Sequence, residues 1–300
     1  MILLYGIPGD GPFEMVADAI EAINGSYVIL DLRKFNQIDF ILHISNETMQ
    51  GELSIGHRSY PLSSFKGIYN RAIDFGSLPA AKHLAPEVYK KYASLFDIIN
   101  QWIECCECKV VNKISAMTSN ASKPYQLKII REFFMVPDTL VTNNIDEAAA
   151  FEKNEGIIYK SASSVRSIVK KMDFINDAGI KNIRYCPTLF QKKLEGTNFR
   201  VHVVGSKVFA AKVESATIDY RYSNREGNDT TITSFKLNKL IKEKCIALAQ
   251  RLQLPFAGID LFLTNEGEWF CFEVNPSPGF SYFEQATGLP IAEAVAKYLM

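Results

Sequence analysis

Hydrophobic and polar positions alternate along the first part of the chain with two different periods. Short apolar runs of strand length occur at residues 2–5 and 27–30, and each is typical of a buried strand. Residues 13–23 and 86–106 instead carry apolar side chains three or four positions apart, as on one face of a helix. This alternation of strands and helices predicts a small α/β unit over residues 1–111.

The pattern changes twice more, so the chain is predicted to have three parts: residues 1–111, 112–197 and 198–300. The second part is expected to open with a helix, for which Ser122 is a suitable N-cap and Pro124 a suitable first-turn residue. The third part is expected to open with a hairpin that turns at Gly205. The elements predicted beyond residue 111 are a strand at 139–142, a helix at 146–154, strands at 156–160 and 188–194, hairpin strands at 199–204 and 207–213, a polar loop at 218–233, a helix at 237–252, strands at 255–263 and 269–275, and a helix at 290–299.

The stretch from residue 269 to residue 279 combines an apolar side with a polar one. Read with the two-residue period of a strand, Cys271, Glu273 and Asn275 point to one side. The residues predicted to point to the other side are Phe270, Phe272 and Val274. A proline-rich turn at 276–279 ends the strand, so the polar pair is expected at the end of a sheet, where ligands bind in α/β folds. A ligand site and a solvated strand end are both compatible with this stretch alone.

A metal site is predicted where this strand pairs with the one before it. Asp260 stands on the preceding strand, so Asp260, Glu273 and Asn275 can converge on one face of an antiparallel pair. Two carboxylates and an amide oxygen suit Mg²⁺ better than Zn²⁺. Upstream, Lys160 precedes the small-residue loop 161–167, and together they could hold phosphate groups. Taken singly, a lysine at a strand end is more often a surface residue.

Composition narrows the function classes. A chain of 300 residues is long for one core and suggests two or three subdomains. It carries 33 basic and 33 acidic residues, so there is no global electrostatic case for binding nucleic acid or a membrane. No apolar run approaches the roughly 20 residues that span a bilayer. The chain is therefore expected to be cytoplasmic.

The chain has six cysteines, and three of them cluster at Cys105, Cys106 and Cys108. Zinc binding is one interpretation, but this spacing lacks a matching downstream pair of Cys or His residues. Reduced, partly buried thiols are the preferred interpretation, and the sequence assigns the cluster no role.

The candidate residues stand in the order and approximate spacing found in the ATP-grasp ligases. These residues are Lys123, Lys160, the run 191–194, Asp260 and the run 273–279. The run 257–288 resembles the RimK-type amino-acid ligases most closely. The segments 208–221 and 69–71 resemble the MvdD-type peptide macrocyclases of graspetide (microviridin) maturation. The resemblance implies an α/β (α+β) fold with an N-terminal pre-ATP-grasp domain, a central lid subdomain and a C-terminal antiparallel sheet.

The resemblance also implies roles for individual residues. Those that match nucleotide-binding positions are Lys123, Lys160, Ser161, Ser163, Ser164, Gln191, Lys192, Lys193, Leu194 and Asn198. Asn198 departs from the family pattern, because many relatives carry an acidic residue for the ribose there. Asp260, Glu273 and Asn275 match the magnesium ligands. Arg200 and Arg221 match arginines directed at the γ-phosphate and the acyl-phosphate oxygens, which gives them catalytic roles.

The activity implied is an ATP-dependent carboxylate–amine ligase that forms an amide bond through an acyl phosphate, with Mg²⁺ (or Mn²⁺) as cofactor. A peptide or protein is the expected substrate, and Arg71 could meet an acidic one. A ligase for free amino acids or dipeptides is the alternative, followed by a non-catalytic nucleotide-binding regulator. No nucleic-acid or membrane partner is expected, and RimK-type relatives suggest a homo-oligomer, either a dimer or a tetramer.

Overall fold

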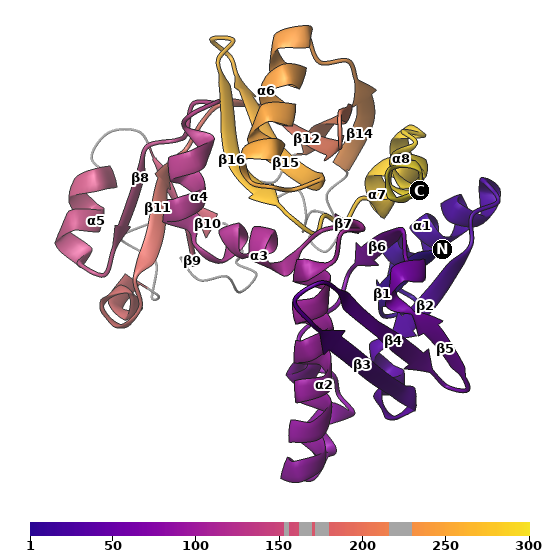
Figure 1. Cartoon of the computed structure of the whole chain (residues 1–300). Coiled ribbons are helices and arrows are strands. Elements are labelled where there is room, and N and C mark those ends of the chain that lie inside the picture. The colour runs from indigo at the N-terminus through magenta and orange to yellow at the C-terminus, as the bar shows by residue number, and fades with distance from the viewer. Residues whose placement is uncertain (153–155, 162–169, 172–179, 216–229) are drawn as a thin grey trace.

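The structure, a computed structural model, describes residues 1–152, 156–161, 170–171, 180–215 and 230–300 (Figure 1). The strands are β1 (Ile2–Gly6), β2 (Tyr27–Asp31), β3 (Ile38–Ile44), β4 (Met49–Ile55), β5 (Arg58–Pro61), β6 (Gly67–Asn70), β7 (Lys109–Val111), β8 (Thr139–Thr142), β9 (Ile157–Ser161), β10 (Lys170–Lys171), β11 (Thr188–Lys192), β12 (Gly196–Val204), β13 (Lys207–Ser215), β14 (Thr230–Phe235), β15 (Phe256–Thr264) and β16 (Trp269–Asn275). The α-helices are α1 (Gly11–Ala22), α2 (Pro86–Cys105), α3 (Ile114–Met117), α4 (Lys123–Ile130), α5 (Ile145–Glu152), α6 (Lys239–Arg251), α7 (Ser281–Thr287) and α8 (Ile291–Leu299). The predicted mixed α/β class is confirmed.

The N-terminal part is built on a parallel sheet with the strand order β2-β1-β6-β7. β1 is buried at every position, as expected for a parallel strand covered on both faces. A separate antiparallel sheet, β3-β4-β5, lies beside the long helix α2. Phe96, Ile99 and Trp102 of α2 share one core with Leu3 of β1 and Leu53 of β4. One apolar helix face therefore joins the two sheets.

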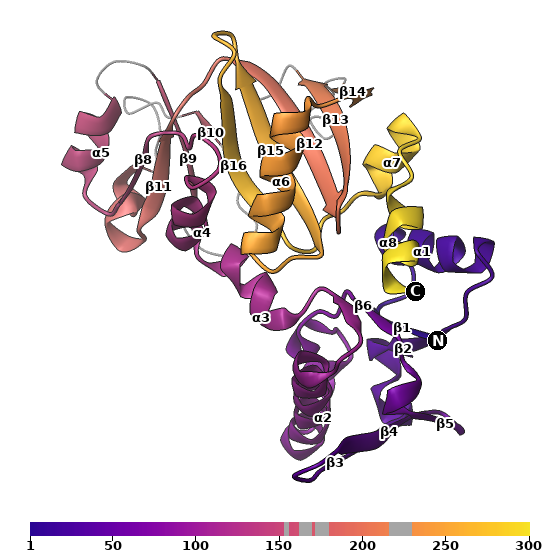
Figure 2. The same cartoon turned by 45° about the horizontal axis from the view of Figure 1, so that its top comes forward.

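The other two sheets are antiparallel. The smaller one has the order β10-β9-β11-β8 and packs on α5 through Ala148, Ile157 and Phe190. The larger one has the order β14-β13-β12-β15-β16. α4 and α6 cover one face of it, and their buried apolar residues form a single core with β12, β15 and β16 (Figure 2). The opposite face of β12 and β15 carries Arg200, His202 and Asp260, with Phe262 beside them.

The C-terminal helix returns to the N-terminal part. α8 lies against α1 in both views, and the two chain ends lie close together (Figures 1 and 2). Ile291, Val295 and Leu299 of α8 share a core with Leu4 of β1 and Phe13 of α1. The predicted boundaries after residues 111 and 197 stay a prediction, and the last helix packs against the first part of the chain as well as the third.

Beyond residue 215 the structure differs from the prediction in two places. Residues 230–233, expected within a polar loop, belong to β14, because the order Thr-Thr-Ile-Thr is β-branched and buries Ile232 beside Val213. The rest of the expected loop, residues 218–229, lies outside the described residues. The short helix α7 was not predicted from the sequence.

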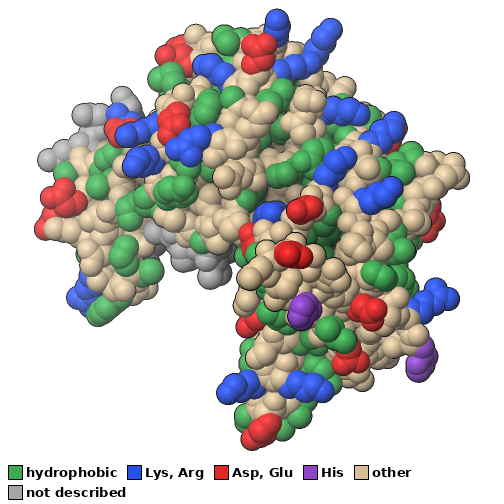
Figure 3. All heavy atoms as spheres, in the orientation of Figure 1, with side chains coloured by type: hydrophobic (Ala, Val, Ile, Leu, Met, Phe, Trp, Pro, Cys, Tyr) green, Lys and Arg blue, Asp and Glu red, His purple; other side chains and the backbone are tan. Residues whose placement is uncertain are grey.

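Charge is spread over the surface. On the face in Figure 3, Lys and Arg side chains are most numerous over the upper part, which carries α6 and the larger antiparallel sheet, and acidic side chains are scattered among them. In the part of the chain that the structure describes, no helix has the length and apolar character needed to cross a bilayer.

Candidate active site

The polar end of the β15–β16 pair is shaped by a bulge. The register shifts between Asp260 and Leu261, so that Glu273 pairs with Asp260 while Cys271 pairs with Leu261. Phe272 is the extra residue on β16. Compared with strict alternation, this extra residue moves the residues before it to the opposite face of the sheet. Asp260 and Glu273 lie after the bulge and stand directly opposite each other.

The strict alternation predicted for β16 is wrong at three positions. Phe270 was expected in the core, but it pairs with Phe262, on the face of β15 that carries Asp260. Cys271 was expected on the polar side, but it is buried in the same core as Val274. Phe272 was expected in the core, but its ring contacts that of Phe262, with 5.4 Å between the centroids. Phe262 shares a face of β15 with Asp260, since the two are two residues apart. The bulge is the physical reason, and it leaves Glu273 on the predicted side.

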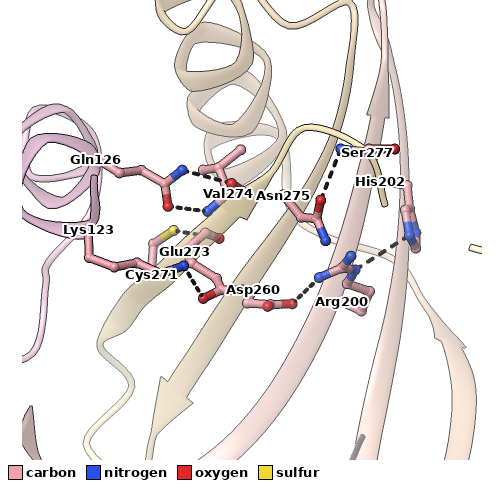
Figure 4. Close-up of polar contacts among 10 residues, drawn as sticks. All are labelled: Lys123, Gln126, Arg200, His202, Asp260, Cys271, Glu273, Val274, Asn275 and Ser277. Carbon is pink, nitrogen blue, oxygen red and sulfur yellow. Dashed lines mark hydrogen bonds and ion pairs between the residues drawn. The ribbon is translucent and has the colours of Figure 1, made fainter. Parts of the chain in front are cut away.

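Each of the two carboxylates is paired with a cation from another element (Figure 4). Lys123 Nζ of α4 donates to Glu273 Oε2 at 3.0 Å. Arg200 Nη1 of β12 donates to Asp260 Oδ1 at 2.5 Å. The four side chains are between 6% and 16% exposed, so these pairs are largely shielded from solvent. Pairs with little solvent screening hold charged groups in defined positions.

The first turn of α4 places Lys123 beside the strand. The Ser122 hydroxyl accepts a hydrogen bond from Tyr125 N, and Pro124 occupies the first turn, as predicted. One turn later, the buried Gln126 clips the helix to β16. Its Nε2 donates to Val274 O at 2.8 Å, and its Oε1 accepts from Val274 N at 3.0 Å. The side-chain amide thus pairs with the strand as another strand would.

The Arg200 guanidinium is enclosed by the fold. Its Nε donates to His202 Nε2 at 3.5 Å, and the group lies 5.8 Å from the centroid of the Phe283 ring. Burial, and then the positive charge of Arg200, hold the pKa of His202 well below its ordinary value. His202 is therefore a neutral acceptor for the arginine. No role was predicted for it from the sequence.

Gly258 on β15 leaves the space that Arg200 occupies. A Cβ at this position would lie 2.6 Å from Arg200 Nη2 and 2.7 Å from Pro278 Cβ. Gly258→Ala is therefore expected to displace the guanidinium and, for the ATP-dependent ligase activity that the resemblance implies, to lower the rate of ADP release about tenfold or more. The matched control is Gly279→Ala, next to Pro278 in the turn after β16, where an added Cβ meets nothing within 4 Å. Equal rates in the two variants would contradict this role for Gly258.

The turn after β16 is held from two sides. Asn275 Oδ1 accepts from Ser277 N at 2.9 Å, which closes the turn locally. Arg71 Nη1 donates to Ser277 Oγ at 3.2 Å, and Arg71 Nε pairs with Asp10 of the N-terminal part. Arg71 was suggested as a contact for an acidic substrate, but here its guanidinium joins this turn to the N-terminal part. Asn275 keeps a second lone pair on Oδ1 for a ligand.

The other predicted nucleotide-binding residues lie on the smaller antiparallel sheet. Lys160 of β9 is buried and pairs in register with Leu189 of β11. Gln191 of β11 is also buried, and its Nε2 donates to Thr139 Oγ1 at 3.0 Å. The backbone of the next two residues is engaged: Lys192 N donates to Asp138 O, and Lys193 N to Gly156 O. These bonds hold the end of β11 beside the smaller sheet, just before the chain enters β12 of the larger sheet.

The structure brings one set of predicted residues together and leaves another undetermined. Lys123, Glu273, Asp260 and Arg200 are joined pairwise, with Asn275 beside them (Figure 4). Leu194 is half-buried after β11, and Asn198 lies on β12 opposite Phe262. Only the backbone of Ser161 is described, at the end of β9. Ser163, Ser164 and Arg221, together with most of the small-residue loop, lie outside the described residues.

Three supporting residues were missed from the sequence. They are Gln126, Asn112 and Gly258. Gln126 lies on the predicted helix and is buried, but no role was predicted for it from the sequence. Asn112 directly follows the strand β7 and bonds to Phe256 and Pro276. Local pattern gives no signal for contacts with strands more than 140 residues away.

The donor set is compatible with Mg²⁺. Among the described residues, no cluster of three or more His, Cys, Asp or Glu side chains could hold a metal. The set available is two facing carboxylates and one amide oxygen, Asp260, Glu273 and Asn275. Hard oxygen donors with room for phosphate oxygens and water suit Mg²⁺, which needs few protein ligands. The lysine and arginine on the two carboxylates provide further positive charge for an anion.

Solved structures define the class of fold. A RiPP-associated ATP-grasp ligase from Chryseobacterium gregarium, in complex with ADP and a leader and core peptide, matches 99% of this chain and 96% of its own, with a TM-score of 0.84 and 20% identity. Macrocyclase MdnC from Microcystis aeruginosa MRC, bound with precursor peptide MdnA, matches 99% and 98%, with a TM-score of 0.82 and 20% identity. The ATP-grasp ligase PsnB with a precursor variant, Mg and ADP matches 99% and 97%, with a TM-score of 0.81 and 21% identity. The predicted ATP-grasp fold is confirmed.

The sequence itself matches a family that is narrower than the ATP-grasp fold. Residues 161–299 match the family described as RimK-like ATP-grasp domain, so the predicted RimK-type resemblance is confirmed for this region. A protein from Cellvibrio japonicus (strain Ueda107), named probable alpha-L-glutamate ligase, is 34% identical over 111 residues, 37% of this chain. The chain spans 36% of the length of that relative.

Proposed function

We propose that the protein is an ATP-dependent carboxylate–amine ligase that forms an amide bond on a peptide or protein. The observation that carries the proposal is the arrangement of Asp260 and Glu273, which face each other and are paired with Arg200 and Lys123. Two carboxylates fixed in this way, with cations from two further elements, suit a polyphosphate and its metal. The ATP-grasp fold and the RimK-like match support the nucleotide.

The residue roles follow from charge and position. Asp260, Glu273 and Asn275 would hold Mg²⁺, which when bound neutralises phosphate charge. Lys123 and Lys160 would bind the nucleotide phosphates as point charges. Gln191, Lys192, Lys193 and Leu194 would hold the adenine, largely through backbone groups. Arg200 would hold the γ-phosphate, and Arg221 the oxygens of the acyl phosphate. Ser161, Ser163, Ser164 and Asn198 complete the proposed nucleotide site.

The reaction requires positioning and charge neutralisation more than a protein nucleophile. A substrate carboxylate attacks the γ-phosphoryl group of ATP, and ADP leaves. An amine then attacks the resulting acyl phosphate, and phosphate leaves as the amide forms. An arginine at the developing oxyanion lowers the barrier for this second step.

A peptide substrate is supported by the solved structures with leader, core or precursor peptides, which match 95% or more of both chains. Ligation of free amino acids is the second candidate, since the curated relatives are named glutamate ligases. A dimer or tetramer, Mn²⁺ as an alternative metal, and a cytoplasmic location remain predictions from the sequence.

The test is a screen for ADP release with the purified chain, ATP and Mg²⁺. Acidic peptides with an internal amine, free amino acids and dipeptides are compared with ATP alone. We expect release above the ATP-only rate with at least one peptide, and loss of one water from that peptide by mass spectrometry. Release only with amino acids or dipeptides favours the second candidate. Saturable ATP binding with no release across the panel would overturn the ligase proposal.

A further inference from the structure

The junction between α2 and β7 carries a group of thiols that the proposed ligase does not use. Cys105 is the exposed last residue of α2, Cys106 is buried and Cys108 is half-buried. The Sγ atoms of Cys106 and Cys108 lie 3.0 Å apart in a hydrogen-bonded contact. A disulfide bond is about 2.05 Å long, so a displacement of about 1 Å would bring them to bonding distance.

Both sulfur atoms belong to a turn that is anchored on either side. Cys106 N donates to Trp102 O at 2.8 Å, which continues the helical ladder of α2. Cys106 Sγ donates to Ile103 O at 3.3 Å, so its direction is set as well. On the other side of Cys108, Lys109 N donates to Lys66 O at 3.1 Å at the start of β7. The closeness of the two thiols therefore results from the fold and not from a free chain end.

The surroundings divide the two thiols into an acidic one and a proton donor. The hydrogen bond from Cys108, supported by the positive charge of Lys113, lowers the pKa of Cys106. The same hydrogen bond, followed by burial, raises the pKa of Cys108. Lys113 is itself held in place, because its Nζ donates to Glu104 O at 2.7 Å. A thiolate next to a thiol is the starting point for disulfide formation.

The other cysteines provide a contrast. Cys186 is exposed, and Cys245 and Cys271 are buried in the core, where desolvation raises the pKa of both thiols. Within the described ranges, Cys106 and Cys108 are the two cysteines whose sulfur atoms form a hydrogen bond with each other. In the described part of the chain, no group of three or more His, Cys, Asp or Glu side chains is placed to hold a metal ion.

We propose that Cys106 and Cys108 form a reversible dithiol–disulfide pair that reacts with hydroperoxides. The Cys106 thiolate attacks one oxygen of hydrogen peroxide; a sulfur–oxygen bond forms, the oxygen–oxygen bond breaks, and hydroxide leaves and takes up a proton as water. Cys108 then attacks the sulfenic sulfur of Cys106. The sulfur–sulfur bond forms, the sulfur–oxygen bond breaks, and a second water leaves. Two thiols are oxidised and one peroxide is reduced.

The experiment treats the reduced 300-residue chain with one equivalent of hydrogen peroxide, then alkylates it and maps its peptides by mass spectrometry. We expect the alkylated cysteines to fall from six to four, with the link mapped between Cys106 and Cys108 and reversed by dithiothreitol. In Cys108→Ser, a dimedone adduct on Cys106 is expected in place of the disulfide. Cys105→Ser is the matched control and should oxidise like the unmodified chain.

Several outcomes would overturn the proposal. A disulfide that includes Cys105, whether within one chain or between two chains, would show that exposure governs the reaction. Oxidation of Cys105 and Cys186 at a rate equal to that of Cys106 would show that the contact gives no preference. Retention of all six thiols at one equivalent of peroxide would show that the pair is inert. Each of these results is read on the unmodified chain and does not depend on a variant folding.

Discussion

Replacing Glu273 with glutamine is expected to lower the rate of ADP release by about 100-fold or more. Glutamine keeps the size of the side chain and one oxygen but removes the negative charge opposite Asp260. Losing a charged ligand weakens metal binding, and losing one charge-stabilising contact in an active site costs about 10²–10³ in rate. Steady-state ADP release is measured with the acceptor that gives turnover in the unmodified chain.

The structure predicts that this variant stays folded. Glu273 packs no core and is about 16% exposed, and Lys123 retains its contact with Asn120 Oδ1 at 3.2 Å. The matched control is Glu266→Gln, an exposed glutamate in the turn between β15 and β16. It makes the same chemical change at the turn of the same hairpin, away from Asp260, and should leave the rate unchanged. Unchanged turnover in Glu273→Gln would remove Glu273 from the site and with it the proposed metal ligands.

Much of the fold could be predicted because it rests on local periodicity. The apolar spacing of residues 86–106 gives α2 within one residue, and the hairpin at Gly205 matches β12 and β13. Short patterns of this kind indicate which face of an element is buried, because the residues of that face lie only a few positions apart in the sequence. Asp260 and Glu273 were paired correctly for the same reason, since a short turn joins their strands.

The parts that could not be predicted depend on distant contacts or on broken periodicity. The bulge at Phe272 interrupts the two-residue period, and it has no glycine to announce it. Gln126 and Asn112 are buried amides whose partners lie 148 and 144 residues away. The packing of α8 on α1 likewise joins the two ends of the chain. Each of these long-range contacts selects one partner surface among many in the chain. Local sequence patterns do not specify which surface that is.

Arg71 shows how a single position can carry two interpretations. An arginine at the end of a strand is typical of substrate binding as well as of a structural ion pair. The contact with Asp10 and Ser277 favours the second, because the side chain is only 14% exposed. The turn after Asn275 has a second support in Asn112, the residue that directly follows β7, because Asn112 Nδ2 donates to Pro276 O.

Replacing Asn112 with leucine is expected to lower the free energy of unfolding by about 3 kcal/mol or more. The Asn112 side chain is buried, with its Nδ2 donating to Phe256 O at 2.6 Å and its Oδ1 accepting from Phe256 N at 3.1 Å. Leucine has a similar size but leaves these backbone groups and Pro276 O without their partner. Each buried polar group without a partner costs about 1–3 kcal/mol.

The measurement is a urea titration followed by circular dichroism and by tryptophan fluorescence. Coincident transitions allow the free energy to be extrapolated, whereas separated ones would show that the N-terminal part unfolds apart from the rest. Asn265→Leu, at an exposed position in the turn between β15 and β16, is the matched control and should change stability by less than about 0.5 kcal/mol. If the two variants are equally stable, Asn112 does not join the two parts. If Asn112→Leu also slows ADP release under conditions where it remains folded, the contact between Asn112 and Pro276 also supports the active site, because Pro276 directly follows Asn275.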